Sequence, residues 1–292
     1  MSVSATPLHP LFAAEFSGVQ ASGSLDRRTM EQVIALMDRH AVGVFRHASA
    51  VPDEQHIAFS RLLGPMQLTP ILSVKSAGKA ARDMPPEIID QGNLDRDGNI
   101  FPENDKRLLY KRANQLWHTD VSFHPVRATY SLLSAHVVPP GGADTEFADM
   151  RAAWDALPGS MQATIADLRA EHSYWHSRVV AGGPEPSEEE RSSRPPARHP
   201  LVHLHPGSKR RALYLASHAS HIVGWPEDEG RALLRELTDF ATQPQFVYRH
   251  QWRVGDIVAW DNLATMHRAT PFDDTRHRRD MRRTTVREAE VA

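Results

Sequence analysis

The sequence predicts an α+β fold, with a double-stranded β-helix (jelly roll) as its core and helices flanking it. Apolar segments of strand length are numerous, and turns rich in glycine, proline or aspartate separate them. Helical periodicity gathers near the N-terminus and in two later inserts, which favours an antiparallel core over alternating strands and helices. No internal repeat or linker divides the 292 residues, so we expect a single domain, 1–292.

Composition excludes several classes of function. The net charge is only −2, which gives no reason to expect nucleic acid or a membrane surface as a partner. No run of 18 apolar residues predicts a membrane span, and the first residues lack the pattern of a secretory signal, so we expect a cytoplasmic protein. The chain has no cysteine, which restricts any metal site to histidine and carboxylate ligands.

The N-terminal part contains two expected helices, each next to an expected strand. Residues 11–23 are typical of a short strand and a turn, after which Asp26 can cap a helix with apolar residues at helical spacing. Residues 41–45 form a short apolar run, which indicates a buried strand. A second helix is expected from Val51 to Leu63, because proline and acidic residues stand in its first turn and Gly64 follows it.

Two segments lack regular periodicity. Residues 66–113 contain basic, proline-rich and turn-like stretches, and irregular segments of this length often act as lids over binding sites. We therefore expect a candidate lid at 66–113, with a plain surface excursion as the alternative. Residues 183–197 are polar and rich in proline, which indicates a surface loop or a mobile insert.

The remaining elements continue the mixture of strands and helices. Strands are expected at 130–138, 145–147, 245–252, 256–260 and 282–286, and a hairpin at 201–215. Helices are expected after Asp149, after Pro158 and over 227–242, where apolar residues recur at helical spacing.

The first candidate for chemistry is the sequence Trp117-His118-Thr119-Asp120. His118 and Asp120 are two residues apart, so their side chains share one face if the backbone is extended. One imidazole and one carboxylate supply two of the three ligands in the 2-His-1-carboxylate site of non-heme Fe(II) proteins. The spacing is weak evidence by itself, because the chain has 17 histidines.

A third ligand should come from a distant strand, and His267 is the candidate. It follows an expected strand, and arginines follow it about a dozen residues later, from where a guanidinium could bind an acidic co-substrate. His203 and His205 also have the spacing of metal ligands, but no carboxylate accompanies them. We interpret this second pair as structural or pocket-lining.

Four motifs strengthen this interpretation: WHTDVSF, GGADTEF, WDNLATMHRAT and RRDMRRTT. In this order and spacing they resemble the taurine dioxygenase family of Fe(II)/2-oxoglutarate-dependent dioxygenases. The resemblance extends through nearly the whole chain and is greatest to the branch of 2,4-dichlorophenoxyacetate dioxygenases. It implies a jelly-roll enzyme that uses Fe(II), 2-oxoglutarate and O2.

The resemblance also implies a role for individual residues. The expected Fe(II) ligands are His118, Asp120 and His267. The expected ligands of 2-oxoglutarate are Thr145 and Arg279, with Arg278 as the alternative, because the span from His267 to the double arginine is one residue longer than in the relatives. The expected substrate-binding residues are Arg283, which would hold an anionic group, and Asn114.

The implied reaction is hydroxylation of the carbon next to the ether oxygen of an aryloxyacetate. The resulting hemiacetal collapses to a phenol and glyoxylate, while 2-oxoglutarate becomes succinate and CO2. The expected partner is a small anionic, aromatic substrate, and the relatives indicate a homo-oligomer. Two alternatives stay open: a dioxygenase of taurine, another alkylsulfonate or a small carboxylate, and a non-catalytic jelly-roll binding protein.

Overall fold

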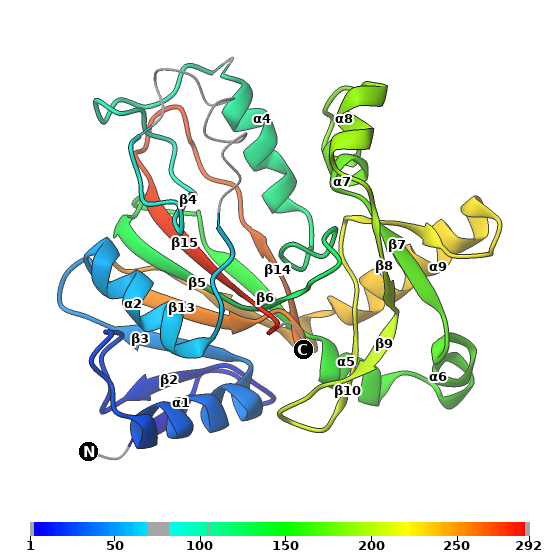
Figure 1. The fold of residues 1–292 in the computed structure, drawn as a ribbon, viewed down its shortest axis with the longest axis horizontal. Coiled ribbons are helices and arrows are strands. Elements are labelled where there is room, and N and C mark those ends of the chain that lie inside the picture. Colours follow the sequence, from blue (N-terminus) through cyan, green and yellow to red (C-terminus); the bar gives the residue numbers. More distant parts are fainter. Residues whose placement is uncertain (1–2, 69–81, 104, 290–292) are drawn as a thin grey trace.

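Two β-sheets facing each other form the centre of the molecule (Figure 1). The computed structural model describes residues 3–68, 82–103 and 105–289. The strands of the large sheet run in the spatial order β1 (Ser4–Pro7), β2 (Ala14–Ser17), β3 (Val42–Arg46), β13 (Asp256–Asp261), β5 (Ala128–Val137), β15 (Asp280–Arg287) and β4 (Ile89–Asp90). The small sheet has the order β12 (Val247–His250), β6 (Thr145–Asp149) and β14 (Thr265–Ala269).

An apolar layer joins the two sheets. Phe147 of β6 packs against Trp260 of β13 with ring centroids 5.5 Å apart, and both side chains are fully buried. Leu133 and Met281, from β5 and β15, belong to the same cluster of buried side chains. Alternating residues on each strand thus supply this layer, as expected for packed antiparallel sheets.

Helices α1 (Arg27–His40) and α2 (Asp53–Leu63) contribute buried apolar side chains to a cluster on the other face of the large sheet. Asp26 caps α1 by accepting a hydrogen bond from the backbone N–H of Thr29 at 2.7 Å. The buried side chains of α1 are Met30, Val33 and Met37, which recur at helical spacing and therefore share one face.

A long insert between β6 and β12 forms the right-hand end of the molecule as drawn in Figure 1. Its helices are α5 (Met150–Ala156), α6 (Gly159–Ile165), α7 (Tyr174–Val180), α8 (Glu188–Ser193) and α9 (Glu227–Ala241), followed by the 3-10 turn η2 (Pro244–Phe246). Its strands are β7 (Arg169–His172), β8 (Ala197–Pro200), β9 (Val202–Leu204), β10 (Arg211–Leu213) and β11 (Ala219–Ile222). Strands β9 and β10 form the expected hairpin.

Helix α8 lies inside the segment 183–197, for which the sequence indicated a loop or a mobile insert. Ser187 and Glu190 form a capping box, in which each side chain bonds the backbone N–H of the other residue. Three glutamates in the first turn add a favourable interaction with the helix dipole. These local interactions account for a short exposed helix despite the surrounding prolines.

The described part of the candidate lid 66–113 is attached to the large sheet. Strand β4 pairs with β15, and the Asn93 side chain donates hydrogen bonds to the carbonyls of Asp274 and His277. Helix α4 (Lys106–Arg112) and the 3-10 turn η1 (Ala113–Gln115) then lead toward His118. Residues 69–81 and 104 lie outside the described residues, so the lid stays a prediction.

None of the described helices is long and apolar enough to cross a membrane.

We expect the stability of this fold to decrease at mildly acidic pH because of His56. This residue of α2 is fully buried next to β15, where Thr284 Oγ1 lies 3.1 Å from its Nε2. Burial lowers the pKa of His56 from 6.5 to about 4, so the folded chain binds fewer protons than the unfolded chain within this window. The free energy of unfolding should therefore fall as the pH drops from 6.5 toward 4.

The variant His56→Gln isolates this contribution, because glutamine can still bond Thr284 but does not titrate. Chemical denaturation at several pH values should give a shallower pH dependence for the variant, by up to ~1.4 kcal/mol per pH unit. Equal slopes for the two proteins would contradict the assignment.

Candidate metal centre and adjoining pocket

A two-hydrogen-bond backbone bridge brings His118 and His267 together. The N–H of His118 donates to the carbonyl of His267 at 3.0 Å, and the N–H of His267 donates to the carbonyl of His118 at 2.9 Å. Strand β14 supplies His267, while His118 lies three residues after the end of η1. The bridge sets the two imidazole rings side by side, with centroids 4.2 Å apart.

Asp120 completes the expected set of three ligands. Its Oδ2 lies 3.6 Å from His267 Nε2, and its Oδ1 lies 3.9 Å from His118 Nε2. One ligand atom from each residue lies within 4.8 Å of the other two, and all three residues are buried. The structure therefore brings together the two imidazoles and the carboxylate of the 2-His-1-carboxylate arrangement.

The protonation of these side chains suits metal binding. Burial lowers the pKa of both His118 and His267, so the rings are uncharged at neutral pH. Nδ1 of His118 lies 2.8 Å from the carbonyl of Leu116, to which it must donate, and this leaves the lone pair of Nε2 available. Burial opposes ionisation of Asp120, but the positive charge of Arg283 holds its pKa below the ordinary value.

A buried network orients the carboxylate of Asp120. Ser131 Oγ donates to Asp120 Oδ2 at 2.7 Å, and Asn262 Nδ2 donates to Ser131 Oγ at 3.0 Å. The Asn262 Oδ1 also accepts hydrogen bonds from the N–H of Asp120 at 3.1 Å and from Trp260 Nε1 at 3.2 Å. Asn262 therefore fixes both the backbone and, through Ser131, the side chain of Asp120.

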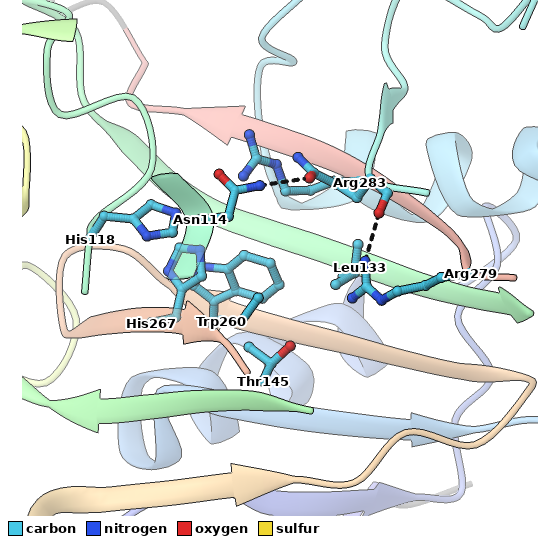
Figure 2. Close-up of a pocket in the computed structure, with 10 residues that line it drawn as sticks. Asn114, His118, Leu133, Thr145, Trp260, His267, Arg279 and Arg283 are labelled. Carbon is cyan, nitrogen blue, oxygen red and sulfur yellow. Dashed lines mark hydrogen bonds between the residues drawn. The ribbon is translucent and has the colours of Figure 1, made fainter. Parts of the chain in front are cut away.

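Arg283 bonds the other oxygen of the same carboxylate. Its Nη1 donates to Asp120 Oδ1, while its Nε is buried and has no hydrogen-bond partner among the described residues. The side chain comes from β15 and lines a pocket next to the two histidines (Figure 2). Arg283 thus lies where an anion beside the metal centre would bind.

The two expected 2-oxoglutarate ligands line the same pocket. Thr145 stands on β6, and its Oγ1 accepts a hydrogen bond from Trp252 Nε1 at 3.1 Å. Among the described residues none accepts a hydrogen bond from its O–H, which is therefore available to a ligand. Arg279 is buried, and burial lowers its pKa to about 10, which still leaves it charged at neutral pH. Arg278 is exposed and does not line the pocket, so the geometry favours Arg279 over this alternative.

Asn114 lines the pocket, as does Trp260, which stands in a ligand motif of the sequence; Gln91 and Leu133, which the sequence did not identify, line it too. Leu133 and Trp260 are apolar parts of the wall, and Gln91 is a polar one. Gln91 Oε1 accepts a hydrogen bond from Asn114 Nδ2 at 2.9 Å. No motif marks Gln91, because it lies in the irregular segment 66–113 and reaches the pocket only through the pairing of β4 with β15.

A second group of potential ligands consists of Asp38, His205 and Asp261. Nε2 of His205 donates to Asp261 Oδ2 at 2.8 Å, and Nδ1 accepts from the N–H of Ser208 at 2.9 Å. Both ring nitrogens are thus used within the protein, and His205 anchors the turn between β9 and β10. This geometry gives His205 a structural role, and it places Asp261 beside a pair for which the sequence indicated no carboxylate.

Comparison with known proteins identifies the family. The profile described as "Taurine catabolism dioxygenase TauD, TfdA family" matches residues 4–285. The chain is 44% identical to the alpha-ketoglutarate-dependent 2,4-dichlorophenoxyacetate dioxygenase of Cupriavidus pinatubonensis over the full length of both proteins. It is 34% identical to the (S)-phenoxypropionate/alpha-ketoglutarate-dioxygenase of Sphingobium herbicidovorans, covering 93% of this chain and 91% of that protein.

Among solved structures, the chain is similar to AAD-2 in complex with Mn(II) and N-oxalylglycine. The TM-score is 0.89 at 40% identity, and the match covers 99% of this chain and 98% of the other. These comparisons confirm the jelly-roll fold, the family and the dioxygenase class that the sequence indicated. The chain therefore belongs to the taurine catabolism dioxygenase (TauD, TfdA) family.

Proposed function

We propose that this protein is an Fe(II)/2-oxoglutarate-dependent dioxygenase that hydroxylates the carbon next to the ether oxygen of aryloxyacetates. The products would be a phenol, glyoxylate, succinate and CO2. The observation that carries the proposal is the convergence of His118, Asp120 and His267 beside a pocket lined by two arginines. The 44% identity to a 2,4-dichlorophenoxyacetate dioxygenase supports the choice of substrate class.

The cofactors of the family are Fe(II), 2-oxoglutarate and O2, and the ligand set suits them. Two uncharged imidazoles and one ionised carboxylate can bind Fe(II) on one face and leave three positions for other ligands. Bound there, the metal and 2-oxoglutarate would activate O2, which supplies the oxidising power of the reaction. The role of the protein would be to hold the 2-oxo acid on the metal and the reacting carbon of the substrate close to it.

Arg279 and Thr145 are the proposed ligands of 2-oxoglutarate. A buried guanidinium pairs strongly with a carboxylate, because water does not screen the interaction. The free O–H of Thr145 can donate a further hydrogen bond to the same carboxylate. The two residues would thereby direct the 2-oxo group toward the three proposed metal ligands.

Arg283 and Asn114 are the proposed substrate-binding residues. Arg283 would hold the substrate carboxylate, so that the carbon between carboxylate and ether oxygen lies near the metal centre. Leu133 and Trp260 would exclude water from this space. Once that carbon carries a hydroxyl group, the hemiacetal collapses to a phenol and glyoxylate without further help from the protein.

Taurine or another alkylsulfonate is the second candidate substrate, because Arg283 can pair with either anion. A purely binding function is disfavoured, since all three proposed ligands are present and buried together. A small anionic substrate is common to both enzymatic candidates. A cytoplasmic location and a homo-oligomeric state stay predictions from the sequence.

The substrate assignment can be tested by measuring O2 consumption and succinate formation with Fe(II) and 2-oxoglutarate. We expect phenoxyacetates to stimulate both above the rate without substrate and to release a phenol. Taurine and sulfate esters, assayed in parallel, should give little stimulation. Stimulation by taurine alone would favour the second candidate.

The 2-oxoglutarate site can be tested with Arg279→Gln and the neighbouring control Arg278→Gln. Loss of the buried guanidinium should raise the KM for 2-oxoglutarate by roughly 10- to 100-fold, as expected for a hydrogen-bonded charge pair. The exposed Arg278 should tolerate the same change with little effect. The opposite result would assign the co-substrate to Arg278.

The network around Asp120 can be tested through metal affinity. Ser131→Ala removes the hydrogen bond to Asp120 Oδ2, and Ser134→Ala, three residues along the same strand, is the matched control. Anaerobic titration with Fe(II) or Co(II) should give affinity about 10- to 100-fold weaker for Ser131→Ala, and nearly unchanged for the control. Equal affinities would argue against a role for Ser131 in orienting the ligand.

A further inference from the structure

The main chain of Gln91 is bonded to strand β15, which carries Arg283, and to Arg279, the residue just before that strand. Its N–H donates to the carbonyl of Met281 at 2.9 Å, and its own carbonyl accepts from Arg279 Nη1 at 2.6 Å. On either side, Asp90 belongs to β4, and the N–H of Asn93 donates to the carbonyl of Arg279 at 3.0 Å. The backbone of Gln91 therefore stays next to Arg279 whatever its side chain is.

The side chain of Gln91 lines the pocket next to Asn114, one of the two proposed substrate-binding residues. Its Oε1 accepts from Asn114 Nδ2, which leaves the Nε2 amide group as the remaining polar end. Among the described residues, none accepts a hydrogen bond from this Nε2. Gln91 lines the pocket together with Asn114 and Arg283, which Figure 2 shows beside His118 and His267.

We propose that Gln91 is a substrate-binding residue, whose Nε2 donates a hydrogen bond to the carboxylate held by Arg283. This inference rests on the proposed function, because it concerns the anion of the same substrate. A carboxylate has two oxygens with about four acceptor sites, and one guanidinium fork leaves some of them unpaired. Arg283 also donates to Asp120 through Nη1, so part of its donor capacity is already used, and a second donor would complete the pairing of the substrate anion.

A neutral donor suits this position better than a third cation. Arg279 and Arg283 already place two positive charges at the pocket, and 2-oxoglutarate would bring its own carboxylate to Arg279. An additional positive charge could bind either 2-oxoglutarate or the substrate carboxylate, so the two binding sites would be less selective. The amide of Gln91 adds a hydrogen bond without attracting 2-oxoglutarate to the substrate side.

The two contacts of Gln91 can be separated by mutation. Its contact with Arg279 is made by the main chain and survives replacement of the side chain. Its contact with the substrate would be lost. Gln91→Leu should therefore weaken binding of the substrate while leaving binding of 2-oxoglutarate unchanged, a pattern that a general disturbance of the pocket would not produce.

The experiment measures phenoxyacetate binding to the full chain loaded with Mn(II) and 2-oxoglutarate without O2, by calorimetry, alongside steady-state KM values with Fe(II). Gln91→Leu should raise the Kd and the KM for phenoxyacetate about 10- to 100-fold, as for a hydrogen bond to a charged group. The KM for 2-oxoglutarate should stay close to that of the wild type, because the main-chain contact with Arg279 is intact.

Two further variants complete the test. Gln91→Glu keeps the size of the side chain but opposes the substrate anion with a negative charge, so it should weaken phenoxyacetate binding more than Gln91→Leu does. Gln245→Leu makes the same chemical change at an exposed glutamine that does not line the pocket, and this variant should bind both ligands normally.

The inference is overturned if both Gln91 variants bind phenoxyacetate as tightly as wild type, or if they weaken 2-oxoglutarate equally. Failure of the proposed function would look different, since the wild type itself would then not couple aryloxyacetates to succinate formation. In that case the comparison uses the anion that does couple. Weaker binding of that anion by Gln91→Leu supports the role of Gln91, and unchanged binding rejects it.

Discussion

The reciprocal backbone hydrogen bonds between His118 and His267 are the constraint on which the site depends. Strand β14 is itself paired with β6, so the bridge transmits the register of the small sheet to the segment after η1. In that register Phe147 lies opposite His267, and Thr145, two residues away, faces the same side. A shift of one residue would turn either Thr145 or His267 away from the pocket.

Around this bridge the charges are arranged so that one buried carboxylate faces several positive or donor groups. Asp120 accepts from Ser131 and Arg283, and its N–H is bonded to Asn262. Burial of an unpaired carboxylate is costly, and these contacts offset that cost in the folded chain. The same arrangement keeps Asp120 ionised, which a metal ligand requires.

Much of the fold and the proposed metal ligands could be predicted, because they depend on local patterns. The capping of α1 by Asp26 and the spacing of His118 and Asp120 are visible in short windows of sequence. The choice between Arg278 and Arg279 could not be predicted from the sequence, because it depends on a bulge where β15 begins to pair with β5. The sequence does not reveal Gln91 as a pocket residue, because only the tertiary pairing of β4 with β15 places it there. Helix α8 was not predicted either, because the prolines around it obscure its capping box.

The hydrogen bond between Asp120 and Asn262 joins residues 142 positions apart in the sequence. Contacts of such separation close large loops and form only after much of the chain has been ordered, so a protein built on them folds slowly. The three proposed ligands are then assembled in the native chain and scattered in the unfolded one. A metal ion that binds only the assembled ligands would therefore stabilise the folded state by mass action. It would also slow proteolysis, because less of the chain would be unfolded at any time.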